Sequence, residues 1–129
     1  PVQFPSTTID SYVYPNNDGD LETWPTIRVN GPGENIELTN DTTGKTIALI
    51  AGGGVTLENG DYVSIDMEAA TVTMYDASEG TTTSIIEKLS DASEFWPLVR
   101  GVNVIHCKMT SATSGSIVFT YTRFYQSGR

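Results

Sequence analysis

The chain has 129 residues, of which 38% are hydrophobic and 18% charged, a size and composition typical of one globular domain that needs no metal or disulfide for stability. Sixteen acidic and seven basic residues give a net charge of −9, which disfavours binding to nucleic acid, to anionic polymers and to anionic membrane surfaces. The single cysteine, Cys107, cannot form an intramolecular disulfide, and the sequence contains neither an 18-residue apolar run nor a signal peptide.

The first residues predict a connector. Residues 1–16 contain three prolines, and we expect at most one strand there, around Ile9 to Val13. The chain begins at Pro1, which favours a piece of a longer protein. The run Asn16 to Asp20 predicts a turn. It resembles a calcium loop only superficially, because its glycine is misplaced and no glutamate closes a twelve-residue frame.

Three short strands are predicted between Trp24 and Leu49. The first runs from Trp24 to Val29 with alternating sides, and the run Asn30-Gly31-Pro32-Gly33 ends it. Ile36 and Leu38 mark the second strand, a turn follows from Asn40 to Gly44, and Ile47 and Leu49 mark the third.

The next segment predicts a hairpin. A three-residue loop, Glu58-Asn59-Gly60, would pair the strand at Val55–Leu57 with the strand at Tyr62–Ile65 and place their apolar side chains on one face. The preceding run of Ala51 to Gly54 lacks the lysine and the helix of a phosphate-binding loop, so we interpret it as a connector or bulge.

Further strands follow, separated by turn signals. Thr71 to Tyr75 alternates, Asp76 to Thr83 predicts a polar loop, and Ser84 to Leu89 is compatible with either a strand or one helical turn. Two more strands are expected at Val102–Met109 and Ser116–Tyr125. No segment sustains a helical period for ten residues, so the pattern predicts an all-β, antiparallel sandwich or barrel. In either case residues 17–129 form the domain.

The sequence supplies no convincing catalytic, cofactor or metal site. His106 and Cys107 are adjacent on a predicted strand, so their side chains point to opposite faces and cannot act as a nucleophile–base pair. Cys107 shares its face with Ile105 and Met109. The sixteen carboxylates lie at turns or outward strand positions, where we expect a solvated surface and not a glycosidase pair.

Aromatic residues are the best candidates for ligand contact. We interpret Trp24, Tyr12, Tyr14 and Tyr125 as candidate contacts for a glycan or a partner protein, with packing at the sheet ends as the alternative. Trp96 lies in the apolar run Phe95 to Leu98, and we expect it to be buried.

Several segments together resemble a known family. An acidic Gly19-Asp20 turn, the Trp24-Pro25 pair, Gly31-Pro32-Gly33 and an Asn-x-Thr-Thr-Gly-Lys turn occur in this order. Later segments continue the likeness: Asp61 to Asp66, Thr71 to Met74, Glu94 to Leu98, Gly101 to Ile105 and a final strand ending in Arg123-Phe124-Tyr125. This pattern resembles the C-terminal domain of siphophage distal tail proteins, over roughly residues 17–125. The run Ala51–Gly54 departs from it, as does Arg100, where the family often has proline.

The resemblance implies a galectin-like or jelly-roll sandwich with a structural role in a phage or prophage tail tip. In this family an N-terminal domain forms a ring at the end of the tail tube, and the C-terminal sandwich projects from it. The implied partners are other tail proteins (tail tube, tail-associated lysin, receptor-binding protein). A carbohydrate-binding module for host cell-wall saccharide is the alternative. The isolated domain is expected to be monomeric, and the full-length protein ring-forming, made in the host cytoplasm and located in the virion.

Overall fold

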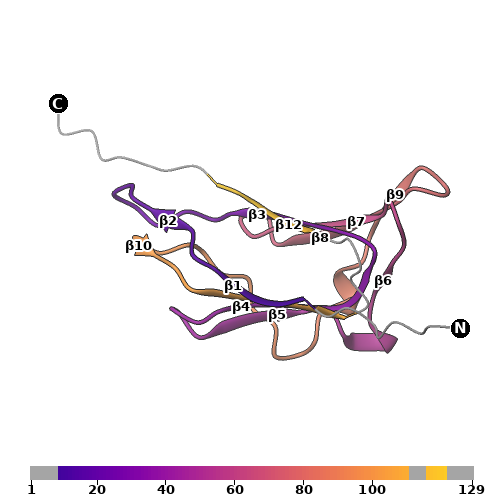
Figure 1. Cartoon of the computed structure of the whole chain (residues 1–129), viewed down its shortest axis with the longest axis horizontal. Helices are drawn as coiled ribbons and strands as arrows, with labels where there is room; N and C mark the ends of the chain where they lie inside the picture. Colours follow the sequence, from indigo (N-terminus) through magenta and orange to yellow (C-terminus); the bar gives the residue numbers. More distant parts are fainter. Residues whose placement is uncertain (1–8, 111–115, 122–129) are drawn as a thin grey trace, which may run out of the picture.

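The computed structural model describes residues 9–110 and 116–121. These residues form two antiparallel β-sheets that pack face to face and are seen edge-on in Figure 1. The first sheet has the strand order β1–β11–β4–β5, with β6 pairing the start of β4; the second sheet has the order β12–β3–β7–β8–β9. The prediction of an all-β, antiparallel sandwich is therefore confirmed.

The strands are short, as the spacing of turn signals predicted. The first sheet contains β1 (Ile9–Val13), β4 (Gly33–Asn40), β5 (Lys45–Ala48), β6 (Thr56–Leu57) and β11 (Ile105–Thr110). The second sheet contains β3 (Thr26–Asn30), β7 (Tyr62–Asp66), β8 (Thr71–Asp76), β9 (Thr81–Ser84) and β12 (Ser116–Thr120). A separate pair, β2 (Asn16–Asn17) with β10 (Gly101–Val102), lies at one end.

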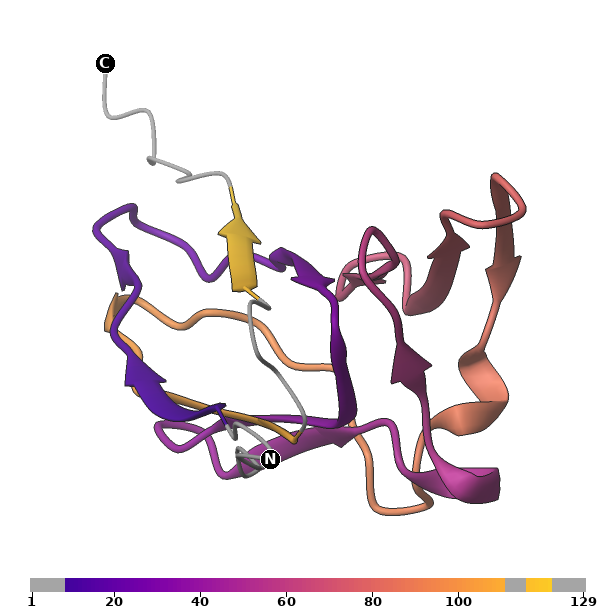
Figure 2. The same cartoon turned by 45° about the vertical axis from the view of Figure 1, so that its right-hand side comes forward.

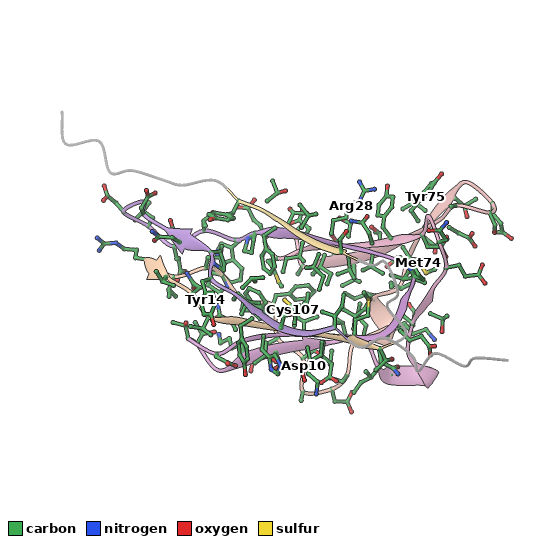
Figure 3. All side chains as sticks on the ribbon, in the orientation of Figure 1. Asp10, Tyr14, Arg28, Met74, Tyr75 and Cys107 are labelled. Atoms are coloured by element: carbon green, nitrogen blue, oxygen red, sulfur yellow. The ribbon has the colours of Figure 1, made fainter. Side chains whose placement is uncertain are left out.

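The core lies between the two sheets and follows from the alternation of the strands. In the second sheet Ile27 of β3 faces Ile65 of β7 in register, and both side chains are fully buried. In the first sheet Cys107 of β11 faces Leu38 of β4, and both are buried. Figure 3 shows Cys107 between the sheets. Because alternate side chains point to one face, each strand contributes apolar residues inward and polar residues outward.

The turn at Gly31-Pro32 takes the chain from one sheet to the other. β3 ends at Asn30 in the second sheet and β4 begins at Gly33 in the first. A Cβ atom on Gly31 would lie 2.6 Å from the carbonyl oxygen of Glu58, so only glycine fits at this crossing. The strand break predicted here is thus a change of sheet.

The predicted hairpin between Val55–Leu57 and Tyr62–Ile65 is wrong. β6 pairs with β4 of the first sheet, whereas β7 pairs with β3 and β8 of the second. The apolar side chains of both segments are buried, as expected, but the two segments belong to opposite sheets. Alternation identified the buried face of each segment; it could not identify the strand that pairs with it.

Asp61 lies in the segment that connects β6 to β7, and it differs from our expectation for the carboxylates. Its side chain is buried, unlike the solvated carboxylates that we expected at turns. Oδ2 accepts the N–H of Glu58 at 2.9 Å, and Oδ1 accepts the N–H of Ala77 at 2.9 Å. Asp61 therefore ties the crossover to the loop that joins β8 and β9.

The ambiguous segment from Ser84 to Leu89 forms a helical turn, and part of the predicted polar loop before it is a strand. β9 (Thr81–Ser84) occupies the end of the predicted polar loop, and a 3-10 turn, η2 (Ile86–Lys88), follows it. A second 3-10 turn, η1 (Ala51–Gly53), forms where we expected a connector or bulge. The two turns lie side by side (Figure 2). Lys88 Nζ donates to the carbonyl of Gly52 at 3.0 Å and so joins the two turns.

One end of the sandwich is closed by the segment from Phe95 to Asn103. Trp96 and Leu98 are fully buried there, as predicted for Trp96. Leu98 pairs with Thr23 through backbone hydrogen bonds of 2.6 and 3.0 Å. Three fully buried asparagines hold the backbone of the segment: Asn17 Nδ2 donates to Leu98 O, Asn40 Nδ2 to Pro97 O, and Asn103 Nδ2 to Val99 O.

The lateral edges of the sandwich differ in how they are protected. Beside β5, Ser90 N–H and Glu94 N–H donate to carbonyls of the strand, so this edge is covered. β9 is an exposed and entirely polar edge strand. Within the described residues, β1 and β12 each pair with a single strand. A cavity of about 150 Å³ lies between them, lined by Ile9, Ser11, Val13, Cys107 and Ile117. We call the edge formed by β1, β12 and this cavity the open side.

Candidate functional site

Trp24 stands beside a cavity of about 200 Å³ at one end of the second sheet. Trp24 and Tyr121 are its aromatic lining residues, and Asp66 and Glu68 are its acidic ones. Three threonine side chains complete the lining: Thr23, Thr26 and Thr120. We call this the Trp24 pocket.

Strand pairing brings the polar residues of the Trp24 pocket together. Thr26 of β3 is in register with Thr120 of β12 on one side and with Asp66 of β7 on the other. The three residues therefore form one row across the outer face of the sheet. Trp24 follows Thr23, whose backbone is paired with Leu98, and the carbonyl of Pro25 accepts the N–H of Met67 at 3.0 Å. These bonds fix the segment that carries the indole.

The Asp66 carboxylate is oriented by the turn after β7. Its Oδ1 atom accepts the N–H groups of Glu68 and Ala69, each at 3.0 Å. This arrangement holds the carboxylate at the end of β7. Glu68 lies in the turn that follows, two residues after Asp66. Trp24 is 39% exposed, whereas Trp96 is fully buried. The pocket thus offers an accessible aromatic surface next to two carboxylates.

Two further aromatic residues lie on the outer face of the second sheet. Tyr62 of β7 and Tyr75 of β8 are in register and stack with ring centroids 5.0 Å apart. The guanidinium of Arg28 lies 3.7 Å from the centroid of Tyr62 and its Nε donates to Asn30 Oδ1 at 2.9 Å. Figure 3 shows Arg28 and Tyr75 on this face, opposite Asp10. A cation over the ring face is favourable because the π-system is negative there.

The predicted aromatic contacts do not form a single platform. Tyr12 lies on β1 in the first sheet and stacks on His106 at 4.4 Å, whereas Trp24 belongs to the pocket on the second sheet. Tyr14 is 62% exposed beyond the end of β1 and does not line the Trp24 pocket. Tyr125 lies outside the described residues.

His106 and Cys107 point to opposite faces of β11, as predicted. His106 Nε2 hydrogen-bonds to Asp10 Oδ1 across the β1–β11 pair, and this bond holds the pKa of the Asp10 carboxyl below its usual value. Cys107 points into the core, where burial raises the pKa of its thiol to about 11. The described residues contain no group of three or more His, Cys, Asp or Glu side chains that could hold a metal ion.

Sequence reasoning found Trp24 but missed the residues around it. Asp66, Glu68 and Thr120 lie far from Trp24 along the chain, and only the order β12–β3–β7 brings them together. The stack of Tyr62 on Tyr75 was missed for the same reason, although both tyrosines occupy outward positions of alternating strands. A correct strand order would have identified both clusters.

The sandwich and its sites can now be compared with known proteins. The family model described as siphovirus-type tail component, C-terminal domain, matches residues 18–125. The chain therefore belongs to this family and is a structural component of a phage tail, where it contacts other tail proteins. No curated protein and no solved structure matches the chain. Among the described residues, no helix has the length and apolar character needed to cross a membrane.

Proposed function

We propose that the chain is the projecting C-terminal domain of a distal tail hub protein and that it docks neighbouring proteins at the tail tip. The observation that carries this proposal is the family match, which covers nearly the whole sandwich. In this proposal an N-terminal domain of the full-length protein forms the ring, after synthesis in the host cytoplasm. The neighbours are the tail tube, the tail-associated lysin and the receptor-binding protein.

The open side of the sandwich is the docking surface in this proposal. Unpaired edge strands present backbone N–H and C=O groups to which another chain can bind, and natural proteins usually protect such edges. β12 carries no charged residue over Ser116–Thr120, and Val118 is 48% exposed. Val13 of β1 is 36% exposed beside the same cavity. A partner with a neutral or basic surface suits this side, because the chain carries a net charge of −9.

The test measures binding of the full-length protein to each purified neighbouring tail protein by calorimetry. We expect Val13→Lys and Val118→Lys to weaken binding to one of these partners at least tenfold, because a lysine placed in a dry interface is left unpaired. Thr82→Lys, on the exposed polar edge strand β9, is the matched control and should bind normally. Unchanged binding by both valine variants would exclude the open side as the docking surface.

Contact with a saccharide is a second candidate function. The observation that favours it is the Trp24 pocket, in which an exposed indole lies beside Asp66 and Glu68. This function does not compete with docking, because the pocket and the open side have no lining residue in common.

A further inference from the structure

We infer that the Trp24 pocket binds one uncharged pyranose ring, with the apolar face of the sugar on the Trp24 indole and its hydroxyl groups donating to Asp66 and Glu68. This inference rests on the second candidate function and names its residues and its ligand class. It excludes phosphorylated and carboxylated sugars as ligands. Four properties of the pocket support it: size, chemistry, rigidity and charge.

The size of the pocket suits a single sugar ring. Its volume of about 200 Å³ is below the roughly 300 to 1,000 Å³ of pockets for drug-sized ligands. The residues that line it come from three strands, two connecting segments and the position after β12, so the cavity depends on the folded sandwich and not on one loop. A pyranose ring is small enough to enter, whereas a long chain could contact the pocket with one residue only.

The lining matches the two kinds of surface on a pyranose. A sugar ring has a face of C–H groups and a rim of hydroxyl groups. The indole of Trp24 offers an apolar face with negative π density, on which polarised C–H groups pack favourably. Ionised Asp66 and Glu68 only accept hydrogen bonds, and bonds from a neutral donor to a charged acceptor are stronger than neutral ones. The hydroxyls of Thr26 and Thr120, which are not buried, can donate or accept hydrogen bonds with further hydroxyl groups of the rim.

The groups of the pocket are held in place before any ligand arrives. Asp66 Oδ1 accepts the two backbone N–H groups of its turn, which orients the carboxylate. Thr26 and Thr120 are fixed by the register of β3 and β12. The backbone of Thr23 is fixed by its pairing with Leu98. Preorganised groups lose little conformational entropy on binding.

The charge of the pocket decides against anionic ligands. Among the described residues, its lining contains two carboxylates and neither lysine nor arginine. Arg28, two residues from Thr26 on the same strand, is directed to Tyr62 and Asn30. A phosphate or carboxylate on the sugar would therefore meet the like charges of Asp66 and Glu68, in a protein whose net charge is −9.

The two tryptophans of the chain provide a direct test by nuclear magnetic resonance. In ¹⁵N-labelled protein each indole N–H gives one signal, which Trp24→Phe assigns by removing one of them. Glucose, galactose and N-acetylglucosamine are added separately, each up to about 50 mM, which detects dissociation constants in the millimolar range. We expect at least one of them to shift the Trp24 signal saturably, with the signal of buried Trp96 unchanged. Glucose 6-phosphate should leave both signals in place.

Matched variants test the carboxylates. We expect Glu68→Gln and the double variant Asp66→Asn/Glu68→Gln to weaken binding, the double variant about tenfold or more. Asp76→Asn is the control: Asp76 accepts the N–H of Ser78 in its turn as Asp66 accepts that of Glu68, but it does not line the pocket. An unchanged Trp96 signal verifies folding of each variant, and Glu68→Gln alone provides the test if Asp66→Asn unfolds the chain.

Three results would overturn the inference. These are a Trp24 signal that no uncharged sugar shifts, full affinity in the double variant, and a saturable shift of the Trp24 signal by glucose 6-phosphate. None of them affects the docking proposal, which is tested by the variants of the open side. Conversely, normal partner binding with Val13→Lys and Val118→Lys leaves the sugar site in place.

Discussion

The environment of Cys107 makes its thiol unreactive despite the adjacent histidine. Burial raises its pKa to about 11, and His106 points to the other face of the sheet. At pH 8 the thiolate population is then about a hundredfold lower than for an ordinary cysteine. We expect an aromatic disulfide reagent to label the native protein far more slowly than the protein unfolded in guanidinium. Because the chain has one cysteine, the whole signal reports this residue, and equal rates would contradict its placement in the core.

The same shift has a defined effect on stability. The pKa of the folded thiol lies above that of the unfolded chain, so the contribution of Cys107 to folding is complete below about pH 8.5. It is lost as the pH rises toward 11, because the unfolded chain releases the proton first.

Trp96 is expected to make a large contribution to folding stability. Its side chain is fully buried in the segment that closes one end of the sandwich. Trp96→Ala should lower the free energy of unfolding by about 3 to 5 kcal/mol, because it leaves a cavity in the core. Trp24→Ala serves as the comparison. Because Trp24 is 39% exposed, its replacement should lower the free energy of unfolding much less. Denaturant titration measures both values, and similar losses would contradict the assigned burial.

At the scale of elements, Asp61 connects the crossover between the two sheets to the loop that joins β8 and β9. Asp61→Ala removes an acceptor from two backbone N–H groups, those of Glu58 and Ala77. We expect a loss of about 2 kcal/mol in the free energy of unfolding, because two hydrogen bonds that join separate loops are lost, each worth about 1 kcal/mol. Asp76→Ala, at an exposed turn, should cost much less. Thermal unfolding of both variants checks the difference; equal costs would mean that burial of Asp61 contributes nothing.

The elements also show what a single sequence can predict. Alternation identified the strands of Ile27, Leu38 and Ile65 and the face that each one buries, because burial of apolar side chains depends on local pattern. It assigned Val55–Leu57 to the wrong partner, since a strand at the end of a short loop can either return as a hairpin or cross to the opposite sheet with the same residues buried. A polar strand such as β9 escaped detection altogether, because an exposed edge strand needs no apolar alternation.

At the scale of the whole molecule, the same limit applies to the candidate site. Trp24 was a candidate because an aromatic side chain can offer a flat surface to a sugar ring or to a partner protein. Asp66 and Thr120 were not, because their proximity to Thr26 depends on the order of three strands, of which β12 is the last in the chain. The stack of Tyr12 on His106 likewise depends on the pairing of the first described strand with β11. Long-range pairing decides which surface residues meet, and local pattern does not contain it.

The assembly state provides the last prediction. A closed ring requires one heterologous interface that repeats around an axis, and in our proposal that interface belongs to the N-terminal domain. The open side would remain available for self-association, but copies of this chain each carry a net charge of −9, and Asp10 lies on β1 itself. This repulsion acts over a Debye length of about 8 Å at physiological salt, so it affects closely approaching edges. We therefore expect the 129-residue chain to be a monomer and the full-length protein to form rings.

Light scattering on the two proteins measures this difference directly. Raising the salt concentration provides the control. Salt screens the charge repulsion between copies of the chain, so it should favour dimers if the isolated chain associates through β1 and β12. Val118→Lys should abolish any such dimer, whereas Thr82→Lys should not. A stable hexamer of the isolated chain at physiological salt would place the ring interface within the sandwich, and the projecting position proposed for this domain would then be wrong.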